Sequence, residues 1–219
     1  MRLVIFDLDG TLVDSKLDLV HSVNAARGLM HLPPISDEVV ASYVGNGAPV
    51  LMRRALGPDA GEEDVRRALE FFLAYYRDHM LDNTRLYPGV REALDRLAEG
   101  GARMAVLTNK PVRFSQAIVD GLGLRGHFFR VYGGNSFEQK KPDPVGIETL
   151  LGETGVPRER AVMVGDSAVD IRTARNARIT ACGVSYGFQP EGFREEPPDL
   201  LVDNMNQLAD YVLEEPSNS

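Results

Sequence analysis

Cysteine is almost absent from this chain, since Cys182 is the only one among 219 residues. One cysteine forms neither an intramolecular disulfide nor a cysteine-rich zinc site, and the four scattered histidines show no metal-ligand spacing. Cys182 lies in a strand-like stretch, which favours a buried and unreactive thiol. We therefore expect a reducing compartment, namely the cytoplasm.

The chain also lacks long apolar runs and an excess of positive charge. No apolar stretch approaches the ~20 residues that a membrane span requires, and Asp7 and Asp9 interrupt the first apolar run before it can form a signal peptide. The formal net charge of −8 argues against a nucleic-acid partner or an anionic membrane surface. The negative net charge is still compatible with a small anionic substrate, because Mg²⁺ and a few lysines can make the binding site locally positive. Residues 214–219 are expected to fray.

The first apolar run, Leu3–Phe6, predicts a strand that is buried on both faces. Asp7 and Asp9 follow at once, where that strand should end. In open α/β sheets, ligands bind beyond the carboxyl ends of the strands. Two carboxylates this close together repel each other unless a cation lies between them or one keeps its proton. The pair therefore indicates a metal ion and acid–base chemistry.

Strand-like and helical stretches alternate from Ala102 onward, which predicts a doubly wound parallel sheet, an α/β fold. The predicted strands are 102–107, 131–134, 161–164, 179–184 and 200–202, and the predicted helices are 112–122, 144–154, 169–177 and 205–213.

The segment between Ser15 and about Asn83 has no convincing strand. Its clearest helix has apolar residues at three- and four-residue spacing, namely Val65, Leu69, Phe72, Leu73 and Tyr76. The simplest interpretation is an all-helical insertion after the first strand, with the α/β core resuming near Tyr87.

Other predicted strands also end in polar residues. Thr108-Asn109-Lys110 follows one strand, and Gly165-Asp166-Ser167 follows another, with Asp170 four residues after Asp166. Lys141-Pro142 precedes a helix. Carboxylate oxygens bind Mg²⁺, a lysine and a threonine suit phosphoryl oxygens, and an ionised aspartate is a competent nucleophile for phosphoryl transfer. Each residue alone also fits a helix cap, a turn or a surface position, but their joint occurrence in this order favours a site.

These motifs resemble those of the haloacid dehalogenase-like phosphohydrolases. Residues 7–15 are similar to the first signature of that family, 108–110 to the second, 141–142 to the third and 165–170 to the fourth. The resemblance implies a Rossmann-like core, residues 1–15 and 84–219, with a helical cap domain, residues 16–83, that selects the leaving group. The second carboxylate, Asp9, indicates the phosphatase branch.

The resemblance also implies roles for individual residues. Asp7 would attack phosphorus and form an aspartyl-phosphate, and Asp9 would act as general acid and base. Thr108 and Lys141 would bind the phosphoryl oxygens, and Leu8 and Asn109 would contact the substrate.

The same resemblance implies Mg²⁺ as the cofactor. Its ligands would be the carboxylates of Asp7 and Asp166 and the backbone carbonyl of Asp9, with Asp170 acting directly or through water.

Within the predicted cap, a turn that contains Gly45, Asn46 and Gly47 could present amides to a carboxylate or phosphate, or could be a plain interhelical turn. Together with residues 107–111, 140–142 and 184–187, this turn resembles a branch of the family, the bacterial phosphoglycolate phosphatases. That resemblance implies 2-phosphoglycolate as substrate, with glycolate and phosphate as products. Lys16 and Pro49 depart from the pattern, and Pro49 removes one backbone donor from the turn.

Other functions remain open at this point. A phosphosugar mutase or phosphatase, a pyrophosphatase or a nucleotidase could use the same core. A non-enzymatic phospho-receiver also pairs acidic residues with a threonine and a lysine, but receivers are about half this length and carry no helical insertion. The sequence does not distinguish a monomer from a homodimer.

Overall fold

The computed structural model describes residues 1–214, so the tail that was expected to fray lies outside the described residues from Glu215 onward. A six-stranded parallel sheet forms the centre of the fold, in the order β5-β4-β1-β6-β7-β8. The bounds of these strands are β1 (Leu3–Phe6), β4 (Arg103–Leu107), β5 (Arg130–Tyr132), β6 (Ala161–Gly165), β7 (Thr180–Val184) and β8 (Leu200–Val202). The prediction of an α/β fold with a doubly wound parallel sheet is confirmed.

Helices cover both faces of the sheet because the strands are apolar on both sides. Val4 and Phe6 of β1 belong to the core cluster that includes residues of α5, α6 and α9, whereas Leu3 and Ile5 belong to the cluster that includes α7 and α8. The alternation of side chains along the strand sends consecutive residues to opposite faces. These helices are α5 (Val90–Glu99), α6 (Val112–Gly121), α7 (Val145–Thr154), α8 (Ala168–Asn176) and α9 (Met205–Leu213). Short 3₁₀ helices span Arg125–His127, Arg158–Arg160 and Pro190–Arg194.

The central position of β1 creates the ligand-binding edge. The chain crosses from β1 to β4 on one side and returns to β6 on the other, so the strand order reverses at β1. Such a switch point opens a crevice at the carboxyl ends of the strands. Cys182 is buried within β7, and burial raises the pKa of its thiol to about 12.

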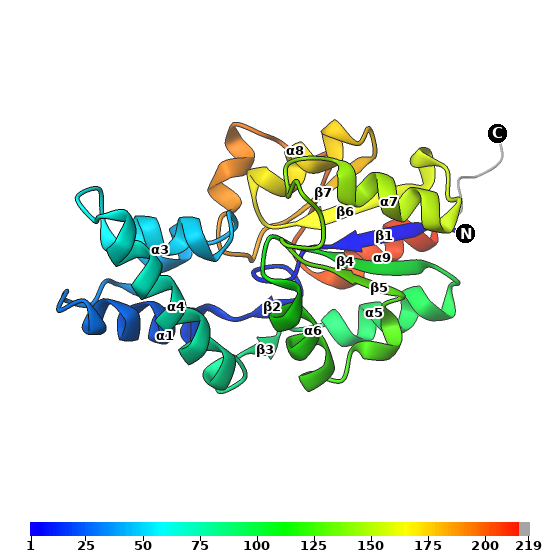
Figure 1. Cartoon of the computed structure of the whole chain (residues 1–219). Coiled ribbons are helices and arrows are strands. Elements are labelled where there is room, and N and C mark those ends of the chain that lie inside the picture. Colours follow the sequence, from blue (N-terminus) through cyan, green and yellow to red (C-terminus); the bar gives the residue numbers. More distant parts are fainter. Residues whose placement is uncertain (215–219) are drawn as a thin grey trace.

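The segment after β1 is helical, as expected, and lies beyond the carboxyl ends of the sheet (Figure 1). It contains α1 (Lys16–Leu29), α2 (Asp37–Tyr43), α3 (Ala48–Leu56) and α4 (Glu62–His79). The predicted apolar face of α4 is present: Val65, Phe72 and Tyr76 are buried, and Leu69 and Leu73 are partly buried. Among residues 1–214, no helix combines the length and the apolar character needed to cross a membrane.

Two short strands that the sequence did not predict connect this helical segment to the sheet. In β2 (Val13–Asp14) and β3 (Arg85–Leu86), the outgoing and the returning chain pair antiparallel. Two residues are too few to produce a periodic pattern, which explains why the sequence showed no signal for them.

Asp18, in the first turn of α1, ties these two connections together. Its fully buried carboxylate accepts hydrogen bonds from the Thr84 amide at 2.8 Å, the Thr84 hydroxyl at 2.7 Å and the Asn83 amide at 3.0 Å. Burial works to raise the pKa of Asp18, but the hydrogen bonds from Thr84 and Asn83 outweigh it and lower the pKa below its ordinary value of 3.8. The ionised carboxylate therefore stabilises the position where the helical segment joins the sheet.

We expect Asp18→Asn to lower the free energy of unfolding by about 2–3 kcal/mol at pH 7, because an amide cannot accept all of the hydrogen bonds that a carboxylate accepts. Because the pKa of Asp18 is lower in the folded state than in the unfolded state, ionised Asp18 stabilises the protein at pH values above its unfolded-state pKa. This stabilisation is lost as the pH falls through the folded-state pKa. The deficit of the variant should therefore shrink between pH 7 and pH 3. Urea unfolding across this range measures it, with the exposed Asp59→Asn as the matched control. A deficit that does not change with pH contradicts this assignment.

Candidate active site

The carboxyl ends of three neighbouring strands bring the main predicted residues together. Asp7 follows β1, Thr108 follows β4 and Asp166 follows β6, and all three are buried. The in-register pairing of β1 with both β4 and β6 sets these positions side by side. The Asp7 amide donates to the Val164 carbonyl at 2.9 Å, which fixes the first of them against β6.

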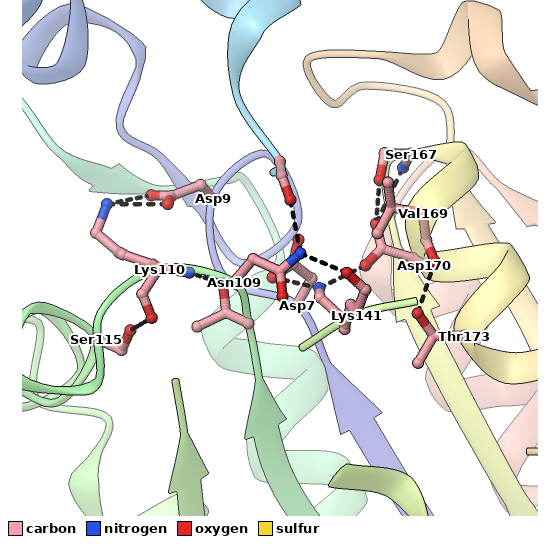
Figure 2. Close-up of polar contacts among 12 residues, drawn as sticks. Asp7, Asp9, Asn109, Lys110, Ser115, Lys141, Ser167, Val169, Asp170 and Thr173 are labelled. Carbon is pink, nitrogen blue, oxygen red and sulfur yellow. Dashed lines mark hydrogen bonds and ion pairs between the residues drawn. The ribbon is translucent and has the colours of Figure 1, made fainter. Parts of the chain in front are cut away.

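Lys141 reaches this edge from the loop before α7 (Figure 2). Its Nζ lies 2.6 Å from Asp170 Oδ1 and 3.0 Å from Asp7 Oδ1. The other oxygen of Asp170 accepts hydrogen bonds from the Ser167 amide at 3.1 Å and the Ser167 hydroxyl at 2.7 Å, in a capping box that begins α8. Asp170 therefore caps a helix and contacts the site lysine at the same time.

Three buried carboxylates form the acidic part of the site. Ligand oxygens of Asp7, Asp166 and Asp170 lie within 4.8 Å of one another. Burial raises the pKa of Asp7 to about 6, against the lowering effect of the Lys141 charge. Burial, and then the charges of Asp170 and Asp7, raise the pKa of Asp166 well above its ordinary value. Both shifts indicate that the protein alone provides too little positive charge here, so a divalent cation would fit.

Asp9 faces away from that cluster. Its carboxylate accepts a hydrogen bond from Ser15 Oγ at 2.5 Å. Each of its oxygens also accepts one from Lys110 Nζ at 2.9 Å (Figure 2). Only its backbone carbonyl is therefore left for the metal role that the resemblance implied, and the carboxylate is held by a lysine. Lys110 also donates to the hydroxyl of Tyr76, on α4, at 2.7 Å.

The predicted cap turn meets the core with its carbonyl groups. Asn109 Nδ2 donates to the Gly45 carbonyl at 2.9 Å, and Lys140 Nζ donates to the Asn46 carbonyl at 3.0 Å. Gly47 has a φ of +87°, a conformation that favours glycine, and begins α3. Gly45 and Gly47 line the cavity described below, but Asn46 does not.

A small cavity joins the acidic cluster to the helical segment. A water-sized group can place its centre within about 50 Å³ of this cavity, which is partly open to solvent. Its polar wall contains Asp7, Asp9, Thr108, Asn109, Lys110, Asp166 and Ser167, and its apolar wall contains Leu19, Leu51, Phe72, Phe114 and Phe188. Leu8, predicted to contact substrate, is fully buried outside this lining.

Residues 4–184 match the family model of haloacid dehalogenase-like hydrolases. The chain belongs to the haloacid dehalogenase-like hydrolase family. A phosphoglycolate phosphatase of Pseudomonas savastanoi pv. phaseolicola is 41% identical over 97% of this chain and 80% of its own length. Another, from Vibrio parahaemolyticus, is 37% identical over 97% of this chain and 96% of its own length.

Solved structures of the family have the same fold. A crystal structure from Haemophilus somnus, described as a predicted phosphoglycolate phosphatase, superposes with a TM-score of 0.91 at 33% identity, covering 96% of this chain and 97% of that one. A structure of a subfamily IA hydrolase from Geobacter sulfurreducens superposes with a TM-score of 0.75 at 23% identity, covering 97% and 96%, and supports the fold alone.

Residues after β7 complete the site, although sequence reasoning gave them no role. The Phe188 amide donates to Asp166 Oδ2 at 2.7 Å, and Gln189 Nε2 donates to the carbonyls of Ala41 at 3.0 Å and Val44 at 2.8 Å. This segment therefore orients a carboxylate of the acidic cluster and contacts the helical segment. The neighbouring residues 184–187 contributed to the resemblance to the phosphoglycolate phosphatases, but that resemblance assigned no role to Phe188 or Gln189.

Gly187 permits this arrangement, because a Cβ there would overlap the Asp166 side chain and lie 2.6 Å from the Gly10 carbonyl oxygen. We expect Gly187→Ala to lower the free energy of unfolding by about 1–3 kcal/mol, the usual cost of overpacking. Gly152→Ala, in helix α7 with nothing near the added methyl, should be neutral or stabilising by up to about 1 kcal/mol. Urea unfolding of both variants checks this, and equal stabilities would contradict the close packing around Asp166.

Proposed function

We propose that this family member is a Mg²⁺-dependent phosphatase that hydrolyses a small phosphate monoester, 2-phosphoglycolate, through an aspartyl-phosphate. The observation that carries the proposal is the placement of Asp7. Its carboxylate lines a small cavity, and its Oδ1 lies 3.0 Å from Lys141 Nζ with no well-directed hydrogen bond among the described residues. A buried carboxylate that faces a cavity beside a lysine can act as nucleophile or metal ligand.

The donor set fits a divalent cation. The site contains four buried carboxylates, those of Asp7, Asp9, Asp166 and Asp170. When all four are ionised, two of their negative charges are not balanced by Lys110 and Lys141. Hard oxygen ligands of this kind suit Mg²⁺. We propose that Asp7, the Asp9 carbonyl and Asp166 hold the ion, with Asp170 beside them. Bound there, Mg²⁺ would neutralise charge on the phosphoryl group.

In the proposed reaction, an oxygen of Asp7 attacks phosphorus while the bond to the leaving alkoxide breaks. Asp9 first takes up a proton from solvent, gives it to that alkoxide, and then takes a proton from the water that attacks the aspartyl-phosphate, which releases phosphate and restores Asp7. Thr108 and Lys141 bind the phosphoryl oxygens, and the Lys141 charge stabilises the transition state. The contact of Asp9 with Lys110 orients its carboxylate towards the cavity.

The leaving group would face the residues of the helical segment that line the cavity, among them Leu19, Leu51 and Tyr76. The relatives named phosphoglycolate phosphatase support glycolate as that group. We propose that the helical segment, residues 16–83, acts as a cap that selects it. The cytoplasmic location stays a prediction.

The chemistry is tested by phosphate release. With millimolar Mg²⁺ the protein should release phosphate from 2-phosphoglycolate faster than from glucose 6-phosphate or pyrophosphate. Asp7→Asn, nearly isosteric, should keep less than about 1% of that activity, because losing a nucleophile costs several orders of magnitude. A fully folded variant above this level contradicts the covalent route. If the wild-type protein shows no turnover of any of these compounds, the phosphatase proposal is wrong.

The metal site is tested by thermal unfolding. Mg²⁺ at 100 times its dissociation constant contributes about 2.7 kcal/mol to stability, so it should raise the melting temperature. Asp166→Asn should remove most of that rise, whereas Asp59→Asn should keep it. The ligands must lose their protons to bind, and burial raises the pKa of Asp7 to about 6, so the rise should be smaller at pH 5.5 than at pH 7.5. An unchanged melting curve in Mg²⁺ contradicts the site.

A further inference from the structure

Tyr76 is a buried residue of the helical segment that reaches the polar part of the cavity. It lies on α4, is 1% exposed and lines the cavity together with Asp9 and Lys110. Two aromatic contacts fix its ring: Phe72 stacks on it with centroids 5.6 Å apart, and Phe114 meets it edge-on at 5.5 Å. The direction of its hydroxyl is therefore set by packing before any ligand binds.

The partner of this hydroxyl determines where its proton can point. Lys110 Nζ lies 2.7 Å from the Tyr76 oxygen, and an ammonium group can only donate hydrogen bonds. The Tyr76 oxygen is thus the acceptor, and its own proton has no acceptor among the side-chain hydrogen bonds of residues 1–214. Burial raises the pKa of Tyr76 above its ordinary value, so the proton is retained. The result is an unused donor beside a buried cation.

The position of this donor defines which ligand it would suit. Lys110 bridges Tyr76 to Asp9, so the free O–H lies close to the group that protonates the leaving oxygen in the proposed reaction. A leaving group with a second oxygen near the ester oxygen could contact Asp9 through the ester oxygen and the Tyr76 hydroxyl through the second oxygen. In glycolate, a single carbon separates the ester oxygen from the carboxylate. The positive charge of Lys110 would favour an anionic oxygen over a hydroxyl.

We infer that Tyr76 is a specificity-determining residue whose hydroxyl donates a hydrogen bond to the carboxylate of the leaving group. The inference rests on the proposed function, because it assigns a substrate contact in the same site. The inference adds to the proposed function that a side chain of α4, next to Lys110, selects leaving groups that carry a carboxylate.

The test compares two esters that differ only in the carboxylate, 2-phosphoglycolate and ethyl phosphate. Tyr76→Phe should lower kcat/KM for 2-phosphoglycolate by roughly ten- to a hundredfold, the effect of one hydrogen bond to a charged group. For ethyl phosphate, kcat/KM should change by less than about threefold. Tyr75→Phe, the same change at the next position of α4, should alter neither value. An equal loss on both esters means that Tyr76 acts through Lys110 and Asp9, and overturns the inference, as does no loss.

A binding measurement separates this inference from the proposed function. Glycolate at tens of millimolar should raise the melting temperature of the wild-type protein, and Tyr76→Phe should reduce that rise while Tyr75→Phe keeps it. An equal rise in wild type and Tyr76→Phe, or no rise in either, overturns the inference. Because glycolate binding needs no turnover, this measurement tests the role of Tyr76 even if the wild-type protein cleaves neither ester.

Discussion

The ion pairs that Lys141 makes with Asp7 and Asp170 are the interactions on which the site depends. All three groups are buried, with side-chain exposures of 9% or less, and their charges would be costly without one another. The negative charges of the two carboxylates both favour the protonated form of Lys141. Burial tends to lower the pKa of Lys141, but the charges of Asp170 and Asp7 raise it above its ordinary value. The lysine therefore stays charged where a phosphoryl group would bind.

This charge arrangement requires the parallel sheet. Asp7 and Asp170 are 163 positions apart, and they meet because β1 and β6 pair in register and only Asp166 and Ser167 separate β6 from α8. The capping box of α8 turns one oxygen of Asp170 towards Ser167, which leaves the other for Lys141. One residue thus links the end of a helix to the electrostatics of the site, and substitution of Asp170 would disturb both.

The sequence predicted the elements whose signals are local. The four-residue apolar run before Asp7 sufficed to place β1, and the acidic and basic motifs were located because each follows a strand or precedes a helix. The pairing of Lys110 with Tyr76 was beyond such reasoning, because the two residues are 34 positions apart on different elements and Tyr76 was indistinguishable from a core aromatic. The role of Asp18 was hidden for the same reason, since its partners lie 65 and 66 positions away.

The cap turn shows why residue type alone did not indicate what the turn does. The sequence left two interpretations of the turn around Asn46 open, amides offered to an anion or a plain interhelical turn, and in the structure Asn109, Lys140 and Gln189 donate to the carbonyls of this region. These hydrogen bonds attach the helical segment to the core through carbonyl oxygens, and they do not involve the amides of Gly45, Asn46 and Gly47. The substrate contacts proposed for this turn therefore stay a prediction. The polar side chains of α1–α4 that line the cavity reduce to one, Tyr76, and its neighbour Lys110 is the cation closest to it. The attachment of the turn to the core and the proposed selection of substrate by Tyr76 therefore use different groups of the helical segment, backbone carbonyls in one case and a side chain in the other.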